Sequence, residues 1–362
     1  MAAGVFTATS LGRVKLQVDD VWKRSPEIDD NQIARAILEN QTANFQAIMA
    51  GGACRGAQVN YIIDCANAIV DCSTIDLTGC DWGGAEVESA TADLDIDQCV
   101  ADQFNINKAE CNDNQVTYER IFAQRLANGL KRIQENLAVA TGVFLDANVQ
   151  TPGTVKYGGV TGDYINFNSI DWENLALLSK IMYDVRQEGV DNGIGISTGL
   201  LWAAQDLNRR KSGGFGVYND PTSGVNIYYD KKFAQLETAL AKEAFIVFDP
   251  NKVAFWTYNF EESDVWLAKG HDDQFSMRYR LPDLVYMNGG SAQPIYVDLH
   301  RKRVCNDTLS GWTDKFISRL QFGFASAPDI CATGDTGIVG FGVSDLLDPI
   351  TCDPCPAPAA TT

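Results

Sequence analysis

The sequence of 362 residues contains only two histidines, His271 and His300. A Ser-His-Asp triad or a Cys-His pair needs an imidazole, so such a site would have to use one of these two side chains. His271 lies in a turn-like polar stretch, residues 270–273, which we interpret as a surface turn. The glycine-containing stretch 193–199 does not fit G-x-G-x-x-G, and no phosphate-loop lysine follows it. The sequence therefore predicts a protein that is not an enzyme, with no catalytic residue, no cofactor and no metal site.

Long apolar runs are also missing from the chain. The purest run, Ala244 to Phe248, has the length of a strand and is far shorter than the roughly 20 residues that span a bilayer. The N-terminal residues lack the continuous apolar core of a signal peptide. We therefore expect a soluble chain that does not enter a membrane and is not exported by the usual route.

Basic residues are scarce: 29 Lys and Arg stand against 47 Asp and Glu, and the formal net charge is −18. Phosphates repel so acidic a chain unless it has a separate basic patch. The densest basic cluster is only residues 300–303, HRKR. We interpret this cluster as a solvated strand end or a subunit contact rather than a nucleic-acid site.

Half of the net charge falls in one segment, residues 51–107, which has one basic residue, Arg55, and ten acidic ones (1 − 10 = −9). Residues 59–63 and 85–97 are strand-like, and a tip rich in turn residues, 78–84, lies between them. We therefore predict a long two-stranded ribbon over residues 53–98. An isolated ribbon is marginally stable in water and needs a surface to rest on.

The clearest helix is predicted over residues 115–140, where apolar side chains recur at spacings of three and four along one face. A shorter helix is predicted over 29–50. We interpret residues 1–28 as polar and without a periodic apolar face, so we expect an irregular arm there. The face of the long helix consists of Phe122, Leu126, Leu130, Ile133 and Leu137.

The second half of the chain alternates short strands with helices over residues 169–289, which predicts a small α/β region. Strands are then expected at residues 273–281, 294–300 and 315–324, returning to a sheet beneath the long helix. The tail, residues 346–362, is rich in proline and should be irregular.

This order of elements resembles the tailed-phage major capsid fold, also called the Hong Kong 97-type fold, over roughly residues 20–325. The resemblance implies an α+β protein with an N-terminal arm, an extended β-hairpin loop, a peripheral domain built on a long spine helix, and an α/β axial domain. Mapped onto this sequence, these parts are the arm at 1–28, the extended loop at 53–98, the peripheral domain at 29–52, 99–168 and 290–345, the axial domain at 169–289, and the tail at 346–362.

The resemblance further implies a function in association. The chain would self-assemble into hexamers and pentamers of an icosahedral phage head that encloses double-stranded DNA, in a virion assembled in the host cytoplasm. Its partners would be copies of itself, a portal, a scaffolding protein and decoration proteins. An acidic subunit should meet the packaged DNA without binding it specifically.

Two tryptophans are candidates for intersubunit contacts, because aromatic side chains carry much of the energy of many interfaces. Trp82 lies at the predicted tip of the ribbon, and Trp22 lies beside Lys23 and Arg24 in the predicted arm. The alternative for Trp82 is an indole that folds onto its own ribbon.

The cysteines of the predicted ribbon are candidates for disulfides. Some relatives lock the shell with a bond between a lysine of the extended loop and a neighbour's asparagine, but residues 53–98 contain no lysine. We hypothesise that disulfides, within or between subunits, brace the mature shell through Cys54, Cys65, Cys72 and Cys80.

Three alternative functions stay open at this point. One is a different virion protein, such as a tail or decoration protein, although the long predicted helix argues against most of these. An encapsulin-like compartment shares the fold without the virion role. An α/β enzyme built on residues 169–289 would have to rely on carboxylates, as glycosidases do.

Overall fold

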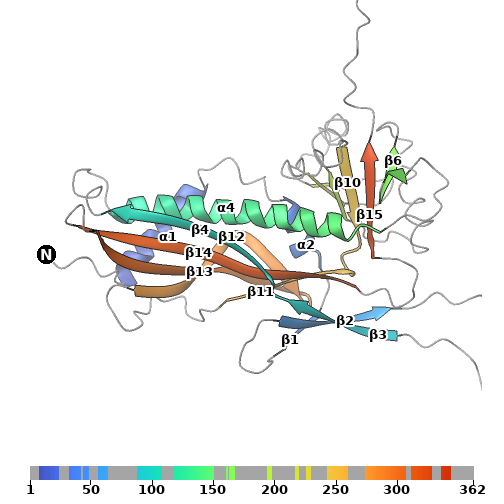
Figure 1. Ribbon diagram of the computed structural model, residues 1–362, viewed down its shortest axis with the longest axis horizontal. Helices are drawn as coiled ribbons and strands as arrows, with labels where there is room; N and C mark the ends of the chain where they lie inside the picture. Colours follow the sequence, from blue (N-terminus) through green and yellow to red (C-terminus); the bar gives the residue numbers. More distant parts are fainter. Residues whose placement is uncertain are drawn as a thin grey trace, which may run out of the picture.

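The computed structural model describes residues 8–23, 32–41, 44–48, 56–63, 88–107, 118–150, 160–161, 163–167, 194–197, 217–219, 226–229, 243–259, 274–306, 311–327 and 336–343. These parts form an elongated body in which one long helix lies along a sheet. A second sheet stands at one end of this body, and a third lies beneath that end (Figure 1). Helices combined with largely antiparallel sheets confirm the predicted α+β class.

The long helix α4, Tyr118–Ala147, has 30 residues and is therefore about 45 Å long. It confirms the helix predicted over 115–140 and continues beyond it. All five residues of the predicted apolar face are buried. Phe122, near the start of the helix, packs against Phe104 and Phe316 of the sheet, at ring-centroid distances of 5.9 and 4.8 Å.

The sheet beneath α4 has five strands and is centred on β14. One side of β14 pairs with β4 over residues 313–322. The other side pairs with β13 over 311–319 and then with β11 over 321–326, so β11 occupies the place that β13 leaves. The three returning strands predicted for this sheet are confirmed and are longer than predicted. The strands are β4 (Gln98–Asn107), β11 (Val253–Tyr258), β12 (Gln274–Asn288), β13 (Ser291–Asn306) and β14 (Gly311–Ser326).

A seven-stranded mixed sheet stands at the far end of α4, in the order β5-β6-β15-β10-β7-β9-β8 (Figure 1). Its central strand β10 is fully buried over Phe245–Phe248, as expected for a strand covered on both faces. Its strands are β5 (Val160–Thr161), β6 (Tyr164–Phe167), β7 (Ile194–Ser197), β8 (Val217–Asn219), β9 (Asn226–Tyr229), β10 (Glu243–Phe248) and β15 (Ile338–Val343).

The predicted ribbon appears as two paired strands, β2 (Gly56–Ile63) and β3 (Glu88–Asp95), with Gly56 opposite Asp95 and Ile63 opposite Glu88. Their antiparallel pairing confirms the expected two-stranded element. A third strand, β1 (Asn44–Ile48), pairs with β2 and widens the ribbon into a small sheet. The tip of the ribbon lies outside the described residues.

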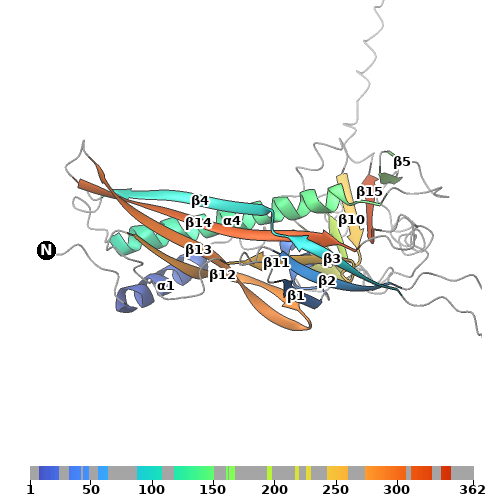
Figure 2. The same ribbon diagram turned by 60° about the horizontal axis from the view of Figure 1, so that its bottom comes forward.

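The prediction of an irregular N-terminal arm is wrong for residues 8–23, which form helix α1 (Ala8–Lys23). Leu11, Val14, Val18 and Trp22 are spaced three and four apart, so the sequence does contain a helical apolar face that the prediction missed. Val18 and Trp22 are buried in the main core, and α1 lies beside α4 (Figure 2). Residues 8–23 therefore belong to the subunit's own body.

The helix predicted over residues 29–50 is also wrong in its second half. Helix α2 covers only Gln32–Leu38, and residues 44–48 form strand β1 instead. The apolar residues Phe45 and Ile48 continued the helical spacing by chance. Pairing of β1 with β2 overrides that local pattern, because a strand at a ribbon edge satisfies its backbone groups through its neighbour.

The sheets divide the chain at different places from the predicted domain limits. Strands β11 and β12 lie in the predicted axial region 169–289, but they belong to the five-stranded sheet. Strands β5, β6 and β15 lie in the predicted peripheral domain, but they belong to the seven-stranded sheet. Pairing between strands that are distant in the sequence decides which sheet each strand joins. The local alternation of strands and helices does not reveal that pairing.

Candidate functional site

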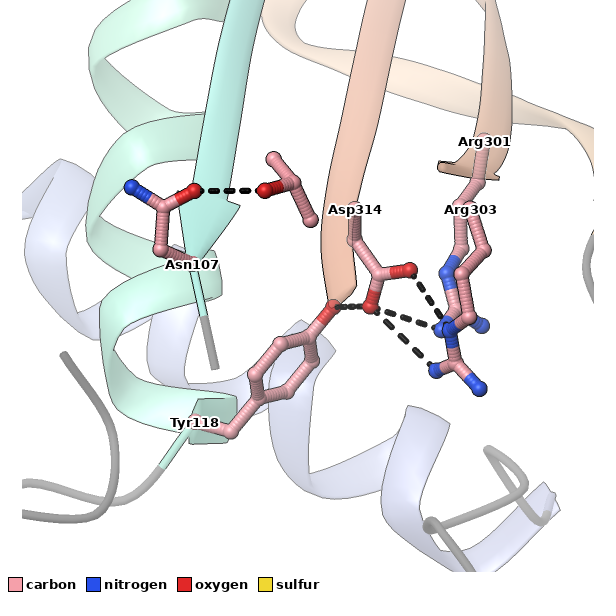
Figure 3. Close-up of polar contacts among 6 residues, drawn as sticks. Asn107, Tyr118, Arg301, Arg303 and Asp314 are labelled. Carbon is pink, nitrogen blue, oxygen red and sulfur yellow. Dashed lines mark hydrogen bonds and ion pairs between the residues drawn. The ribbon is translucent and has the colours of Figure 1, made fainter. Parts of the chain in front are cut away.

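The start of α4 is held to the five-stranded sheet by four polar side chains, which we call the buried charge cluster: Tyr118, Arg301, Arg303 and Asp314 (Figure 3). Asp314 lies directly opposite Arg303 in the β13–β14 register, and Arg301 is two residues further along the same face. Arg301 donates to Asp314 Oδ2 at 2.7 Å, and Arg303 Nε donates to Oδ1 at 3.1 Å. The Tyr118 hydroxyl donates to Oδ2 at 2.7 Å.

The burial and the charges of these side chains make the cluster a clamp that holds the start of α4 on the sheet. The side chains of Arg301 and Asp314 are 4% and 0% exposed, so the ion pair between them is largely shielded from water. Burial and the Asp314 carboxylate both disfavour a phenolate, and they raise the pKa of Tyr118 far above its ordinary value. Tyr118 is the first residue of α4, where the helix dipole also favours a nearby carboxylate. The cluster therefore binds the start of α4 to β13 and β14.

A second junction lies at an irregularity in β12, between Arg280 and Val285, which we call the β12 bulge. Three helices converge on Pro282 and Asp283 there. Trp22 of α1 donates from Nε1 to Asp283 Oδ2 at 2.6 Å, Arg35 of α2 donates to the Asp283 carbonyl at 3.1 Å, and Gln134 of α4 donates to the Pro282 carbonyl at 2.8 Å. Asp283 has a φ of 60°, a left-handed conformation that non-glycine residues rarely adopt. The bulge therefore fixes α1, α2 and α4 against one strand.

Hydrogen bonds from side-chain amides connect β11 to the β12–β13 hairpin, which diverges from it. Gln41 accepts the Phe255 N–H at 2.7 Å and donates to the Met287 carbonyl at 2.6 Å. Asn259, just after β11, donates to the Tyr296 carbonyl of β13 at 2.8 Å. Buried backbone groups must be paired, so these amides replace a missing strand-to-strand ladder.

The three-stranded sheet meets the five-stranded sheet through a small contact on the face away from α4. Val59 of β2 and Leu94 of β3 pack against Ala254 and Ala327. Gly323 faces the end of β3 so closely that a Cβ there would overlap the Asp95 carbonyl oxygen. A short apolar base therefore attaches the acidic ribbon to the body.

Of the predicted site residues, Trp22 alone belongs to the described part of the chain. Trp22 is 4% exposed and is buried in its own subunit's core, so its indole is not available as an anchor for a neighbour. Trp82 and Arg24 lie outside the described residues. The four cysteines proposed for disulfides also lie outside them: Cys54, Cys65, Cys72 and Cys80.

The basic cluster at residues 300–303 is not a solvated strand end, because Arg301 is buried and paired with Asp314. The interpretation from the sequence treated residues 300–303 as one continuous basic cluster. In a strand, however, alternate residues point to opposite faces, so Arg301 and Arg303 face α4 while Lys302 faces away. This period of two, with Asp314 in the following strand, was the available signal for the buried charge cluster.

The described residues offer no group of three or more His, Cys, Asp or Glu side chains that could hold a metal ion. Within the same parts of the chain, no helix is long and apolar enough to span a membrane. The polar groups gathered beneath α4 are arginine–carboxylate and phenol–carboxylate pairs, which hold elements together.

Comparison with known proteins found no family model and no curated protein that matches the chain. Similar solved structures include the cyanophage Pam1 capsid asymmetric unit, at 11% sequence identity and a TM-score of 0.47, covering 87% of this chain and 93% of that chain. The capsid structure of the cyanophage P-SCSP1u is similar at 11% identity and a TM-score of 0.42, with coverage of 85% and 88%. A structure of Mycobacterium phage Che8 is similar at 11% identity and a TM-score of 0.43, with coverage of 82% and 92%.

The two cyanophage structures are structures of capsids. All of these likenesses have TM-scores below 0.5. The function of the chain therefore has to follow from its own geometry.

Proposed function

We propose that the chain is the major capsid protein of a tailed bacteriophage. The observation that carries this proposal is the acidic three-stranded sheet, which in the described residues packs on the body through the small apolar contact around Val59 and Leu94. A ribbon of this kind is marginally stable by itself, so its far part needs a further surface. A neighbouring copy of the same chain supplies such a surface in a closed shell.

The rigid body beneath the ribbon suits the same role. The helix α4 is held at its start by the buried charge cluster and near its middle by the hydrogen bond from Gln134 to the β12 bulge. A shell subunit must transmit contacts between neighbours without bending, and a helix of about 45 Å packed on a five-stranded sheet does so. Symmetry then repeats each contact around a ring and leaves no unsatisfied edge.

In this proposal, copies assemble into hexamers and pentamers of an icosahedral head that encloses double-stranded DNA. A portal, a scaffolding protein and decoration proteins are the expected partners, and the virion is assembled in the host cytoplasm. Residues 53–98 are the extended loop, and Trp82 and Arg24 remain the proposed intersubunit contacts. The net charge of −18 supports enclosure of DNA without specific binding.

Expression of the full chain, followed by sedimentation and negative-stain electron microscopy, tests this proposal. We expect uniform closed particles, or rings of five and six copies that close when a scaffolding protein is added. A chain that stays monomeric over a range of concentration, salt and crowding, with and without scaffold, contradicts it.

A further inference from the structure

The exposed side of α4 has a charge opposite to that of the chain. Residues 120–134 contain four basic residues and no acidic one, whereas the whole chain has 29 basic and 47 acidic residues. The acidic residues of α4 nearest to this stretch are Glu119 before it and Glu135 after it. The helix therefore carries a local positive charge over about four turns.

The cations of this stretch lie together with two side-chain amides, and we call this surface the α4 strip. Steps of three and four residues connect all of its positions, so its members lie side by side on the helix surface. From Arg120 to Arg132 the strip is about 18 Å long, since each residue rises about 1.5 Å. Asn128 and Lys131 are half-buried, and the other members are exposed. The α4 strip consists of Arg120, Gln124, Arg125, Asn128, Lys131 and Arg132.

One carboxylate of the sheet is paired with the α4 strip. Arg132 donates to both oxygens of Asp102 in β4, from Nε at 2.7 Å and from Nη2 at 2.9 Å. The Asp102 side chain is 11% exposed, whereas that of Arg132 is 51% exposed, so the guanidinium still reaches the surface. An arginine has five N–H donors, and this pair uses two of them. Four cations and one carboxylate leave the strip with a charge of +3 (4 − 1 = 3).

The acidic part of the chain lies on the other side of the five-stranded sheet. Val59 and Leu94 attach the three-stranded sheet to the face away from α4. Figure 1 shows β1, β2 and β3 on one side of the five-stranded sheet and α4 on the other. The subunit is therefore electrostatically polar: a phosphate is repelled from the side of the acidic ribbon and attracted to the α4 strip.

We propose that the α4 strip contacts the phosphates of the enclosed DNA without reading its sequence. This inference rests on the proposed function and names the surface of the subunit that binds the genome. Arginine, lysine, asparagine and glutamine are side chains that bind phosphate oxygens, and such contacts carry no sequence information. Phosphates follow one another about every 3.4 Å along the axis for each strand, so a strip of about 18 Å meets several of them.

The contact is weak and depends on salt. Each phosphate that a cation neutralises contributes about −0.9 to the slope of log K against log salt concentration. At about 0.1 M salt the Debye length is about 10 Å, so the acidic ribbon on the far side of the sheet repels DNA at the strip only weakly. A contact of this kind holds DNA near the subunit and still allows it to enter and leave.

Binding of a labelled DNA duplex of arbitrary sequence to the unassembled subunit, followed by fluorescence anisotropy, tests the inference. The variant Arg120→Gln/Arg125→Gln/Lys131→Gln removes three charges from the strip. Glutamine keeps a high helix propensity, so α4 should be retained. Circular dichroism and thermal unfolding check that the variant folds.

The matched control removes the same number of charges from the opposite face of the five-stranded sheet. It is the variant Arg280→Gln/Lys302→Gln/Lys315→Gln, and all three of these side chains are exposed. Lys302 and Lys315 lie directly opposite each other in neighbouring strands, so they form a concentrated charge of their own. The net charge of the two variants is therefore equal, and only the place of the lost charges differs.

We expect the strip variant to bind the duplex at least about tenfold more weakly than wild type at about 0.1 M salt. Its salt slope should be shallower by about 2.7, which is the loss of three phosphate contacts at about 0.9 each. The control should bind like wild type, with an unchanged slope.

A second measurement uses wild-type particles and needs no variant. A dicarbonyl reagent specific for arginine is applied to DNA-filled particles and to particles emptied of DNA, and mass spectrometry quantifies the modified peptides. We expect Arg120 and Arg125 to react at least about threefold less in filled particles, because phosphates cover their guanidinium groups. Arg280 should react alike in both.

The inference is overturned if the wild-type subunit binds no duplex at any salt concentration, or if the control loses as much binding as the strip variant. It is also overturned if Arg120 and Arg125 react alike in filled and emptied particles but are shielded in precursors that contain scaffolding protein, because the strip would then bind a protein. Failure of the proposed function is a separate result: the wild-type chain forms no particle, while duplex binding by the subunit is measured all the same.

Discussion

The Tyr118 hydroxyl donates a hydrogen bond of 2.7 Å to Asp314 Oδ2, and this contact joins the first residue of α4 to a strand 196 residues later in the chain. The same carboxylate also accepts from Arg301 and Arg303. One buried acidic group thus holds the start of the long helix and two strands of the sheet.

Replacing Asp314 with asparagine should destabilise the subunit strongly. Two arginines would lose their shared negative charge in a site where Arg301 is 4% exposed, and an uncompensated buried charge costs about 3–5 kcal/mol. Urea unfolding of the unassembled subunit, followed by circular dichroism, measures the change. Asp102→Asn is the matched control, because its partner Arg132 is 51% exposed and such a pair contributes about 1 kcal/mol or less. Equal losses for the two variants would contradict the clamp.

Stability should fall as the pH rises through the ordinary tyrosine pKa of about 10. The pKa of Tyr118 is raised in the folded subunit, mainly by burial and then by Asp314, so the folded chain keeps a proton that the unfolded chain releases. Stability is then fully present below pH 10 and decreases above it, by up to about 1.4 kcal/mol per pH unit for each such group. Unfolding in urea at pH 8 and at pH 11 tests this.

Other buried tyrosines contribute to the same alkaline loss, because burial also raises the pKa of Tyr164 and Tyr279. Tyr118→Phe should therefore reduce the decline between pH 8 and pH 11 without abolishing it. An unchanged decline in this variant would show that Tyr118 titrates alike in the folded and unfolded chains.

Replacing Gly323 with alanine should loosen the attachment of the acidic ribbon to the body. An added Cβ would overlap the Asp95 carbonyl oxygen, and a backbone atom in a strand has little room to move. Overpacking of this kind costs about 1–3 kcal/mol. Hydrogen exchange should show faster exchange in β2 and β3, while α4 keeps its protection. Gly290→Ala is the control, because a Cβ added there would meet no atom within 4 Å and the φ of +80° strains only the local turn.

The two tryptophans predicted as interface anchors should differ in their effects. Trp22→Ala removes a buried side chain that also donates a hydrogen bond to Asp283. It should therefore cost about 3–5 kcal/mol of subunit stability. Trp82→Ala should leave the subunit folded and impair particle formation. Thermal unfolding and particle yield, measured on both variants, separate the two roles. Normal particle yield from Trp82→Ala counts against the anchor.

Disulfides in the extended loop should appear on a denaturing gel run without reductant. If Cys54, Cys65, Cys72 or Cys80 joins subunits in mature particles, bands larger than the monomer should be present and should collapse when reductant is added. Monomer alone in both lanes would remove the intersubunit form of the hypothesis. Mass spectrometry of alkylated peptides then decides whether bonds within one subunit exist.

Local patterns in the sequence predicted several elements correctly. The apolar residues from Phe122 to Leu137 recur every three or four positions, and this recurrence alone indicates a helix with one buried face. Turn residues between two strand-like runs predicted the acidic ribbon, and β2 and β3 confirm its pairing. Helix α1 was missed although Val18 and Trp22 lie four residues apart, because a charged and polar stretch obscured the spacing.

The sequence by itself determined the long helix, the returning strands and the concentration of negative charge in one ribbon, because each depends on neighbours within a few residues. Only the tertiary structure decided that Asp314 faces two arginines and a tyrosine, and that Lys302 and Lys315 share a row on the opposite face. Those relationships depend on strand register, and a shift by one residue would exchange the two faces. Register is set by packing of the whole sheet against α4, which no single segment of the chain specifies.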